Sequence, residues 1–177
     1  MFMGIYAIVA VIAYLLGSIP FGYILLRVLK GEDVRQHGSG NIGATNVARK
    51  APGLGLATLV LDAAKGYGAV AIAAAVGHSQ WNSTHPGISF IYDAHPWKIS
   101  PTILMALAAS FAILGHVFPI WLKFKGGKGV ATGVGTFLAI APKAVLVVLV
   151  RASVHFRSAL HNGGECARAR TAHASGR

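Results

Sequence analysis

The first 26 residues contain no charged side chain, and this run constrains the fold more than any other feature of the sequence. An α-helix needs about 20 consecutive apolar residues to cross the hydrocarbon core of a bilayer, so Met1 to Leu26 is long enough to span a membrane. A cleaved signal peptide is the alternative, but no basic residue precedes the run, and the run exceeds the roughly 7–15 apolar residues of such a peptide. The sequence therefore predicts a transmembrane helix at its start.

The composition of the whole chain also indicates a membrane protein. Of its 177 residues, 54% are hydrophobic and 12% are charged, and the mean hydropathy is +0.59. Two further runs, 54–77 and 101–122, are long enough to span a bilayer, and a fourth begins near Val130. Tryptophans favour the membrane interface, and those of this chain lie at or close to the ends of the runs: Trp81, Trp97 and Trp121. We therefore expect an all-α, polytopic integral membrane protein.

The basic residues between the apolar runs predict the orientation of the chain. Segment 27–53 carries five lysines and arginines and segment 123–129 carries three lysines, whereas 78–100 has only Lys98. Basic loops remain in the cytoplasm. We therefore expect 31–53 and 123–129 to be cytoplasmic, with 78–100 and the N-terminus outside.

The charge and the cysteine content exclude several other classes of protein. The net charge of +11 does not indicate nucleic-acid binding, because the basic residues are distributed between the apolar runs and do not cluster on one polar face. The single cysteine, Cys166, cannot form an internal disulfide, and no Cys/His spacing resembles a metal site. We expect no nucleic-acid partner, no metal and no cofactor.

The segment GSGNIGATNVAR, residues 38–49, matches the pattern G-x-G-x-x-G at Gly38, Gly40 and Gly43. Asp62 stands about 20 residues further on, as an acidic residue does in a dinucleotide-binding fold. That fingerprint must open a helix directly after a buried strand, whereas here it follows the charged segment KGEDVRQH. The apolar run that contains Asp62 is also too long for a strand, so a dinucleotide site is the weaker interpretation.

A second glycine-rich segment, KFKGGKGVATG at 123–133, is not a Walker nucleotide loop, because Leu122 and Gly129 occupy the positions of its first glycine and its serine or threonine. Both segments still suit a phosphate: glycines let backbone N–H groups approach an anion, lysine adds charge, and a following helix adds its positive end. The alternative is that both segments are ordinary tight loops that bind no ligand. The first segment contains further hydrogen-bond donors, which make this alternative less favourable. These donors are Ser39, Asn41, Thr45, Asn46 and Arg49.

Three ionisable residues lie inside the apolar runs, where such residues usually face the protein interior or a polar cavity. Asp62 and Lys65 have i, i+3 spacing, so they share one helix face and can pair. A structural ion pair and direct substrate contact both remain open for them. His116 is a candidate general base, although a structural histidine is the favoured interpretation.

Four stretches, in this order, resemble the bacterial membrane glycerol-3-phosphate acyltransferases that use acyl phosphate as donor: YLLGSIPFGYIL (14–25), HGSGNIGATNVAR (37–49), LDAAKG (61–66) and LGHVFPIWLKFKGGKGVATG (114–133). The resemblance implies a multi-pass inner-membrane enzyme of about seven helices, of which about four are recognisable here. It implies transfer of a fatty acyl group to the 1-hydroxyl of glycerol 3-phosphate, giving lysophosphatidic acid and phosphate in phospholipid synthesis. The implied partners are glycerol 3-phosphate, acyl phosphate, the lipid bilayer and the soluble enzyme that makes acyl phosphate.

The resemblance also assigns roles to residues of the two glycine-rich segments. Ser39 and Arg49 are implied to be important for activity, and 126–129 to bind glycerol 3-phosphate. We expect Lys128 and backbone amides to offset phosphate charge while Ser39 and Asn41 orient the hydroxyl. No general base is assigned, and a phosphate oxygen of the substrate is a candidate acceptor of the hydroxyl proton. The candidate catalytic residues are Ser39, Asn41, Arg49 and Lys128. The candidate substrate-binding residues are Gly38, Gly40, Gly43, Thr45, Asn46, Asp62, Lys65, His116, Gly126, Gly127, Gly129 and Thr132.

The sequence changes character after Val150, where RASVHFRSALHNGGECARARTAHASGR carries five arginines and no apolar run. The family has a third motif here, R-H-x-x-N, and these residues hold no counterpart to it. Residues 142–150 would form a helix of about 13 Å at about 1.5 Å per residue, which is too short to span. We therefore expect an incomplete transmembrane acyltransferase domain at 1–150 and an aberrant, disordered, arginine-rich tail at 151–177.

Two other functions fit the residues less well. In a small transporter or channel subunit for a phosphorylated anion, the charged helix face and the glycine-rich loops would line the path. In a noncatalytic membrane scaffold, Ser39 and Lys128 would have no biochemical role. Chemical conversion of glycerol 3-phosphate distinguishes the acyltransferase from both.

Overall fold

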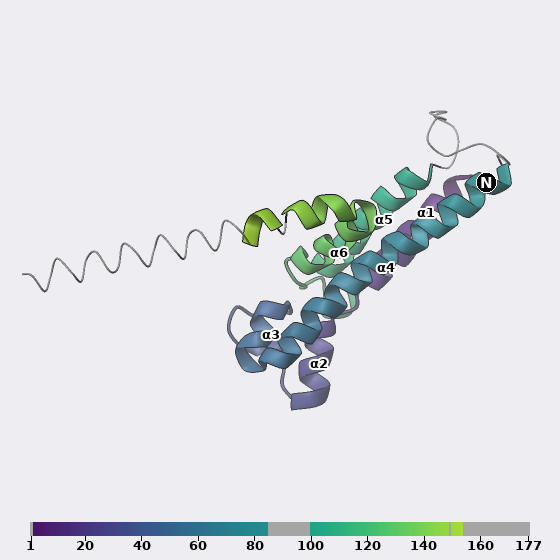
Figure 1. Ribbon diagram of the computed structural model, residues 1–177. Coiled ribbons are helices and arrows are strands. Elements are labelled where there is room, and N and C mark those ends of the chain that lie inside the picture. The colour runs from purple at the N-terminus through teal and green to yellow at the C-terminus, as the bar shows by residue number, and fades with distance from the viewer. Residues whose placement is uncertain (1, 85–99, 149, 154–177) are drawn as a thin grey trace, which may run out of the picture. The chain divides into compact units, whose positions relative to one another are not determined.

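The computed structural model describes residues 2–84, 100–148 and 150–153, and within them the chain is helical with no β-strand (Figure 1). This confirms the all-α prediction. The α-helices and the two short 3₁₀ helices are α1 (Phe2–Gly17), α2 (Phe21–Lys30), η1 (Val34–Gln36), α3 (Ala44–Lys50), α4 (Pro52–Thr84), α5 (Pro101–Val117), η2 (Ile120–Leu122) and α6 (Val130–Ile140).

The chain divides into two compact units, Met1–Ile140 and Ala141–Arg177. All the helices named above belong to the first unit. In the second unit, residues 142–148 and 150–153 are helical. Apart from 151–153, the predicted tail 151–177 lies outside the described residues, and so do most of the predicted outer loop 78–100 and Trp97.

Three helical segments are long and apolar enough to cross a membrane: Met3–Lys30, Pro52–Gln80 and Pro101–Leu122. They correspond to the first three predicted spans. The fourth apolar run forms α6, whose 11 residues extend only about 16 Å. Helix α6 ends before Ala141, because a residue that precedes a proline, here Pro142, disfavours the helical conformation. The described residues therefore contain three candidate spans and not four.

The first span is not one continuous helix, contrary to the prediction for Met1 to Leu26. Helix α1 ends at Gly17 and α2 begins at Phe21. Pro20 has no N–H group and cannot continue the hydrogen-bond ladder of α1. The carbonyl oxygen of Ile19 accepts a hydrogen bond of 2.7 Å from the ammonium group of Lys65 on α4 and one of 3.2 Å from the N–H of Phe21.

The long helices α1, α4 and α5 lie side by side, and α4 also packs against α6 (Figure 1). Their shared core is rich in alanine, and such small residues let helix backbones approach closely inside a membrane protein. Large aliphatic side chains such as Leu56 and Val60 point outward and are more than half exposed, as expected of a surface that meets lipid. The buried core residues are Val9, Ala13, Ala69, Ala73, Leu104, Ala108 and Ala112.

A second core lies around the connection between α2 and α3. It holds Val34 and Ile42 of the first loop against Leu26 of α2, Val47 of α3 and Leu122 of η2. Of these residues Leu122 is the most exposed, at 7%. This core fixes the glycine-rich segment that follows η1 against the helices.

We expect the contact between α4 and α6 to be intolerant of one added methyl group. A Cβ at Gly66 would meet the carbonyl oxygen of Thr132, so Gly66→Ala should lower the free energy of unfolding by about 1–3 kcal/mol, the usual cost of overpacking. Gly68→Ala is the matched control, because a Cβ there meets nothing within 4 Å. Denaturant unfolding of the detergent-purified variants, followed by circular dichroism, measures both. Equal effects of the two substitutions would contradict the close approach.

Candidate functional site

A buried ion pair on α4 lies at the base of the site. The ammonium nitrogen of Lys65 is 2.9 Å from Oδ1 of Asp62, and both side chains are 3% exposed. This confirms the pairing predicted from their spacing. Nδ1 of His116, on α5, lies 3.6 Å from the same carboxylate oxygen, which is too long for a hydrogen bond. The His116 side chain is also 3% exposed, so three titratable groups share one interior position.

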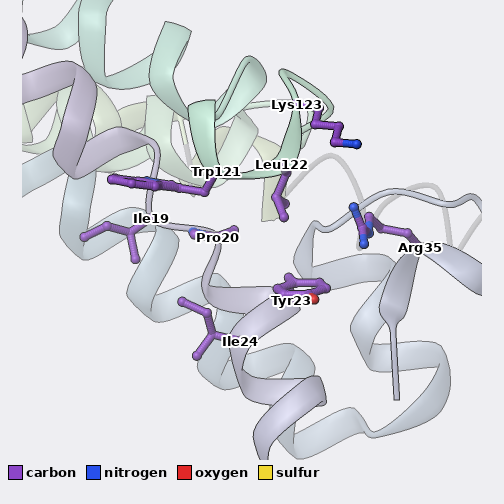
Figure 2. Close-up of a pocket in the computed structure, with 8 residues that line it drawn as sticks. All are labelled: Ile19, Pro20, Tyr23, Ile24, Arg35, Trp121, Leu122 and Lys123. Atoms are coloured by element: carbon purple, nitrogen blue, oxygen red, sulfur yellow. The ribbon is translucent and has the colours of Figure 1, made fainter. Parts of the chain in front are cut away.

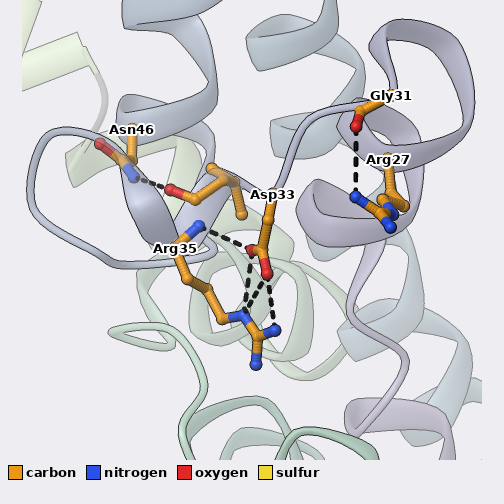
Figure 3. Close-up of polar contacts among 6 residues, drawn as sticks. Arg27, Gly31, Asp33, Arg35 and Asn46 are labelled. Carbon is orange, nitrogen blue, oxygen red and sulfur yellow. Dashed lines mark hydrogen bonds and ion pairs between the residues drawn. The ribbon is translucent and has the colours of Figure 1, made fainter.

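The first glycine-rich loop is organised by the side chain of Asn46 on α3. Its Nδ2 donates to the carbonyl oxygens of Val34, His37 and Asn41 at 2.9–3.0 Å, and its Oδ1 accepts from the N–H of Ser39 at 3.2 Å. Figure 3 shows Asn46 with one of the bonds that its Nδ2 donates. Asn46 is 4% exposed. One amide side chain therefore holds the loop on both sides of Ser39.

Gly38 must be glycine for this arrangement to form. Its φ is 57°, in the left-handed region that residues with a Cβ rarely adopt. A Cβ at this position would also collide with Oδ1 of Asn46. The glycine thus serves the packing of the loop against Asn46.

The second glycine-rich loop folds back on the end of α5. The N–H of Gly126 donates to the carbonyl oxygen of Val117 at 3.1 Å, and the N–H of Gly127 donates to that of His116 at 3.0 Å. The ring of His116 packs against Gly127, where a Cβ would meet Nε2. These two backbone N–H groups are therefore engaged within the chain, which differs from the expectation that they approach an anion.

The start of α6 offers N–H groups that remain available. Gly129 has φ of 76°, and its carbonyl oxygen accepts from the N–H of Gly133 at 2.8 Å. In the described part of the chain, the N–H groups of Val130 and Ala131 have no hydrogen-bond partner, as is usual in the first turn of a helix. Lys128, just before this turn, is exposed. A positive helix end and a lysine thus lie together.

One pocket of about 250 Å³ combines these parts. It lies between the first loop, α3, α4, α5 and the start of α6, and it brings together residues that are far apart in the sequence. The predicted site residues that line it are Ser39, Asn41, Gly43, Thr45, Asn46, Arg49, Asp62, His116, Lys128 and Gly129.

The other predicted site residues do not line the pocket, but most of them contact residues that do. Gly38 packs on Asn46, Gly127 packs on His116, and Lys65 pairs with Asp62. Gly40 has φ of 68° and donates its N–H to His37. The N–H of Gly126 holds the end of α5, as above. Thr132 is fully buried, and its hydroxyl has no hydrogen-bond partner within the described residues.

Four pocket residues were missed by the sequence reasoning: Ala44, Leu59, Val130 and Ala131. Leu59 precedes Asp62 by three positions, so helical spacing from the buried carboxylate would have found it. Val130 and Ala131 contribute from the first turn of α6. Apolar residues at such positions carry no signal of their own, because they are typical of any membrane helix.

The family model described as glycerol-3-phosphate acyltransferase matches residues 7–159 of the chain. The chain belongs to this family. Among similar family members, the glycerol-3-phosphate acyltransferase of Rhodopseudomonas palustris (strain BisB5) is 48% identical over 149 residues, covering 84% of this chain and 64% of the relative. That of Myxococcus xanthus (strain DK1622) is 43% identical over 163 residues, covering 91% of this chain and 74% of the relative.

Solved structures of the family resemble this chain as well. The crystal structure of PlsY (YgiH), an integral membrane glycerol 3-phosphate acyltransferase, in its glycerol 3-phosphate form has a TM-score of 0.61 and 34% identity. The match covers 82% of this chain and 62% of that one. The lysophosphatidic acid form has a TM-score of 0.58 and 35% identity. The chain thus spans about two thirds of the length of the family members it matches.

We expect the buried ion pair to act as one unit in stability. Lys65→Met leaves Asp62 buried without its cation and should cost about 3–5 kcal/mol of unfolding free energy. The double variant Asp62→Asn/Lys65→Met should be more stable than Lys65→Met alone, because no isolated charge remains. Denaturant unfolding of the wild-type chain, both single variants and the double variant gives the coupling energy. Additive losses would contradict a coupled pair.

Proposed function

We propose that this chain is a membrane acyltransferase that moves a fatty acyl group from acyl phosphate to the 1-hydroxyl of glycerol 3-phosphate. The products are lysophosphatidic acid and inorganic phosphate. The observation that carries the proposal is the pocket in which Ser39, Asn41 and Arg49 are joined by Lys128 and the start of α6. Family members solved in a glycerol 3-phosphate form and a lysophosphatidic acid form support the same substrate and product.

The charges and donors of the pocket suit a phosphate group. Arg49 and Lys128 are both exposed and supply two cations. The N–H groups of Val130 and Ala131 point from the positive end of α6, where an anion is stabilised by the helix dipole. The phosphate of glycerol 3-phosphate is held between these groups, and Gly126 and Gly127 contribute by closing the loop and not by binding.

The remaining polar groups of the pocket suit orientation of the reacting hydroxyl. Ser39 and Asn41 lie on a loop whose backbone Asn46 fixes, so both residues are positioned before substrate binds. The side chain of Asn41 is held as well, because its Oδ1 accepts from the N–H of Gly43 at 3.0 Å. The 1-hydroxyl oxygen attacks the carbonyl carbon of acyl phosphate, and the bond from that carbon to the phosphate oxygen breaks. A phosphate oxygen accepts the hydroxyl proton. Lys128 and the helix start offset the negative charge that develops.

The buried groups serve the pocket from beneath. Asp62 and His116 line it, whereas Lys65 holds the carbonyl oxygen of Ile19 and neutralises Asp62. We assign Lys65 a structural role. The ring of His116 packs against Gly127, and we propose a structural role for this residue as well.

The protein lies in the cell inner membrane, with both glycine-rich loops on the cytoplasmic face and the N-terminus outside. The three candidate spans and the basic residues of these loops support this orientation. Soluble glycerol 3-phosphate then reaches the pocket from the cytoplasm, where a soluble enzyme supplies acyl phosphate. The fatty chain of the donor remains in the bilayer.

We expect membranes that contain the chain to incorporate labelled glycerol 3-phosphate into lysophosphatidic acid when acyl phosphate is the donor, and not when acyl-CoA is. Lys128→Ala should lower the turnover about 100-fold or more, as removal of a charge-stabilising group from an active site does. Lys125→Ala is the matched control, because it removes an exposed lysine of the same loop that does not line the pocket.

Two outcomes would contradict the proposal. Unchanged glycerol 3-phosphate inside sealed vesicles, with no lipid product, would indicate a transporter. Equal losses of turnover from Lys125→Ala and Lys128→Ala would show that activity depends on the general charge of the loop and not on the position of Lys128 in the pocket.

A further inference from the structure

A second pocket, of about 680 Å³, shares no lining residue with the pocket described above. It lies between the connection of α1 to α2, the 3₁₀ helix η1 and the segment that follows α5 (Figure 2). Ile19 and Pro20, at the break between α1 and α2, and Trp121 and Leu122 of η2 contribute to its lining. The proposed acyl transfer uses none of its residues.

This pocket has an apolar side and a basic side. Figure 2 shows Ile19, Ile24 and the ring of Trp121 on one side, with Arg35 and Lys123 on the other. Trp121 is 63% exposed and Ile24 is 40% exposed, so the apolar wall is open to the surroundings. An exposed apolar wall beside two cations suits a molecule that has both a fatty chain and an anionic head.

The cation of Arg35 is held rigidly in position. Its Nε and Nη2 donate to the carboxylate of Asp33 at distances from 2.7 to 3.2 Å (Figure 3), and its guanidinium carbon lies 5.0 Å from the centre of the Tyr23 ring. The hydrogen bonds from Arg35 hold the pKa of Asp33 at about 2, so the carboxylate stays charged at neutral pH. Nη1 of Arg35 has no hydrogen-bond partner in the part of the chain that the structure describes.

The basic side carries one net positive charge. Asp33 neutralises Arg35, whereas Lys123 makes no ion pair within the described residues. A phosphodiester carries a single negative charge, which matches this balance. The ammonium group of a zwitterionic lipid would add a positive charge next to Lys123 and would be less favourable.

The place of the pocket in the fold indicates where its ligand comes from. Trp121 and Leu122 are at the end of the third candidate span, Pro101–Leu122, and Lys123 follows directly. Tryptophan favours the level of the lipid head groups, and basic pockets at the ends of membrane helices on the cytoplasmic side bind anionic head groups. The apolar wall then faces the acyl chains of the same lipid.

We propose that this pocket binds one anionic phospholipid of the surrounding bilayer, with its phosphodiester at Arg35 and Lys123 and an acyl chain along Ile19, Ile24 and Trp121. The site is separate from acyl transfer, since such a lipid is neither the donor nor the acceptor of the reaction. Binding of the lipid therefore tests this inference independently of the proposed function.

The test uses Trp121 as its own reporter. In a background of Trp81→Phe and Trp97→Phe, Trp121 is the single tryptophan of the full chain. The chain is placed in phosphatidylcholine vesicles, and phosphatidylglycerol with brominated acyl chains replaces increasing fractions of the lipid. We expect half-maximal quenching at about a fivefold lower fraction of brominated phosphatidylglycerol than of brominated phosphatidylcholine, since one basic residue near a membrane surface is worth about that factor.

Matched lysine variants then locate the site. Lys123→Gln should remove the difference between the two lipids, whereas Lys125→Gln, in the same loop but outside the pocket, should preserve it. Equal quenching by the two lipids in the parent chain would overturn the proposal. Equal effects of the two lysine variants would also overturn it, because general surface charge would then explain the preference. A change in Trp121 fluorescence on addition of inorganic phosphate, without quenching by the brominated anionic lipid, would show a site for a free anion instead.

Discussion

The ion pair between Asp62 and Lys65 connects the parts of this protein that are otherwise separate. Lys65 donates to the carbonyl oxygen of Ile19 and so stabilises the break between α1 and α2. Asp62 lies beside His116 of α5 and reaches the pocket between the two loops. A single helix face of α4 therefore neutralises a buried charge, donates to a backbone carbonyl beside Pro20, and supports the floor of the site. In the low-dielectric interior, Asp62 and Lys65 stabilise the fold only as a pair, because either charge without the other would be buried and unpaired.

The two glycine-rich loops differ in how they use glycine. In the first, Gly38 lets the chain pass over Asn46, and that amide then fixes the loop around Ser39. In the second, Gly126 and Gly127 give their N–H groups to the end of α5, and the free donors occur just afterwards, at the start of α6. Much of the glycine content of both loops thus serves close packing of backbone on backbone. Packing of this kind positions the few side chains and N–H groups that remain open to a ligand.

The break between α1 and α2 also contributes to the proposed lipid pocket, which contains Arg35 of the first loop. Residues 31–43 connect the two pockets, since η1 contributes Arg35 to the larger one, and Ser39, Asn41 and Gly43 contribute to the smaller one. Asn46 bonds the carbonyl oxygens of Val34 and His37, on either side of Arg35. The geometry of the first loop is therefore common to the proposed lipid site and to the proposed active site, although no residue lines both.

The sequence by itself determined that the chain is helical and membrane-spanning, because long runs without charge have no other stable arrangement. It also determined the pairing of Asp62 with Lys65, because helix geometry alone puts them on one face. The break at Pro20 and the end of α6 before Pro142 follow from the local constraints of proline, which a search for apolar runs leaves out. Two features depended on the tertiary structure: the engagement of Gly126 and Gly127 with the end of α5, and the meeting of the first loop, α3, α4, α5 and α6 in one pocket. Both depend on which distant groups lie nearby, and local periodicity carries no information about contacts between helices that are far apart in the sequence.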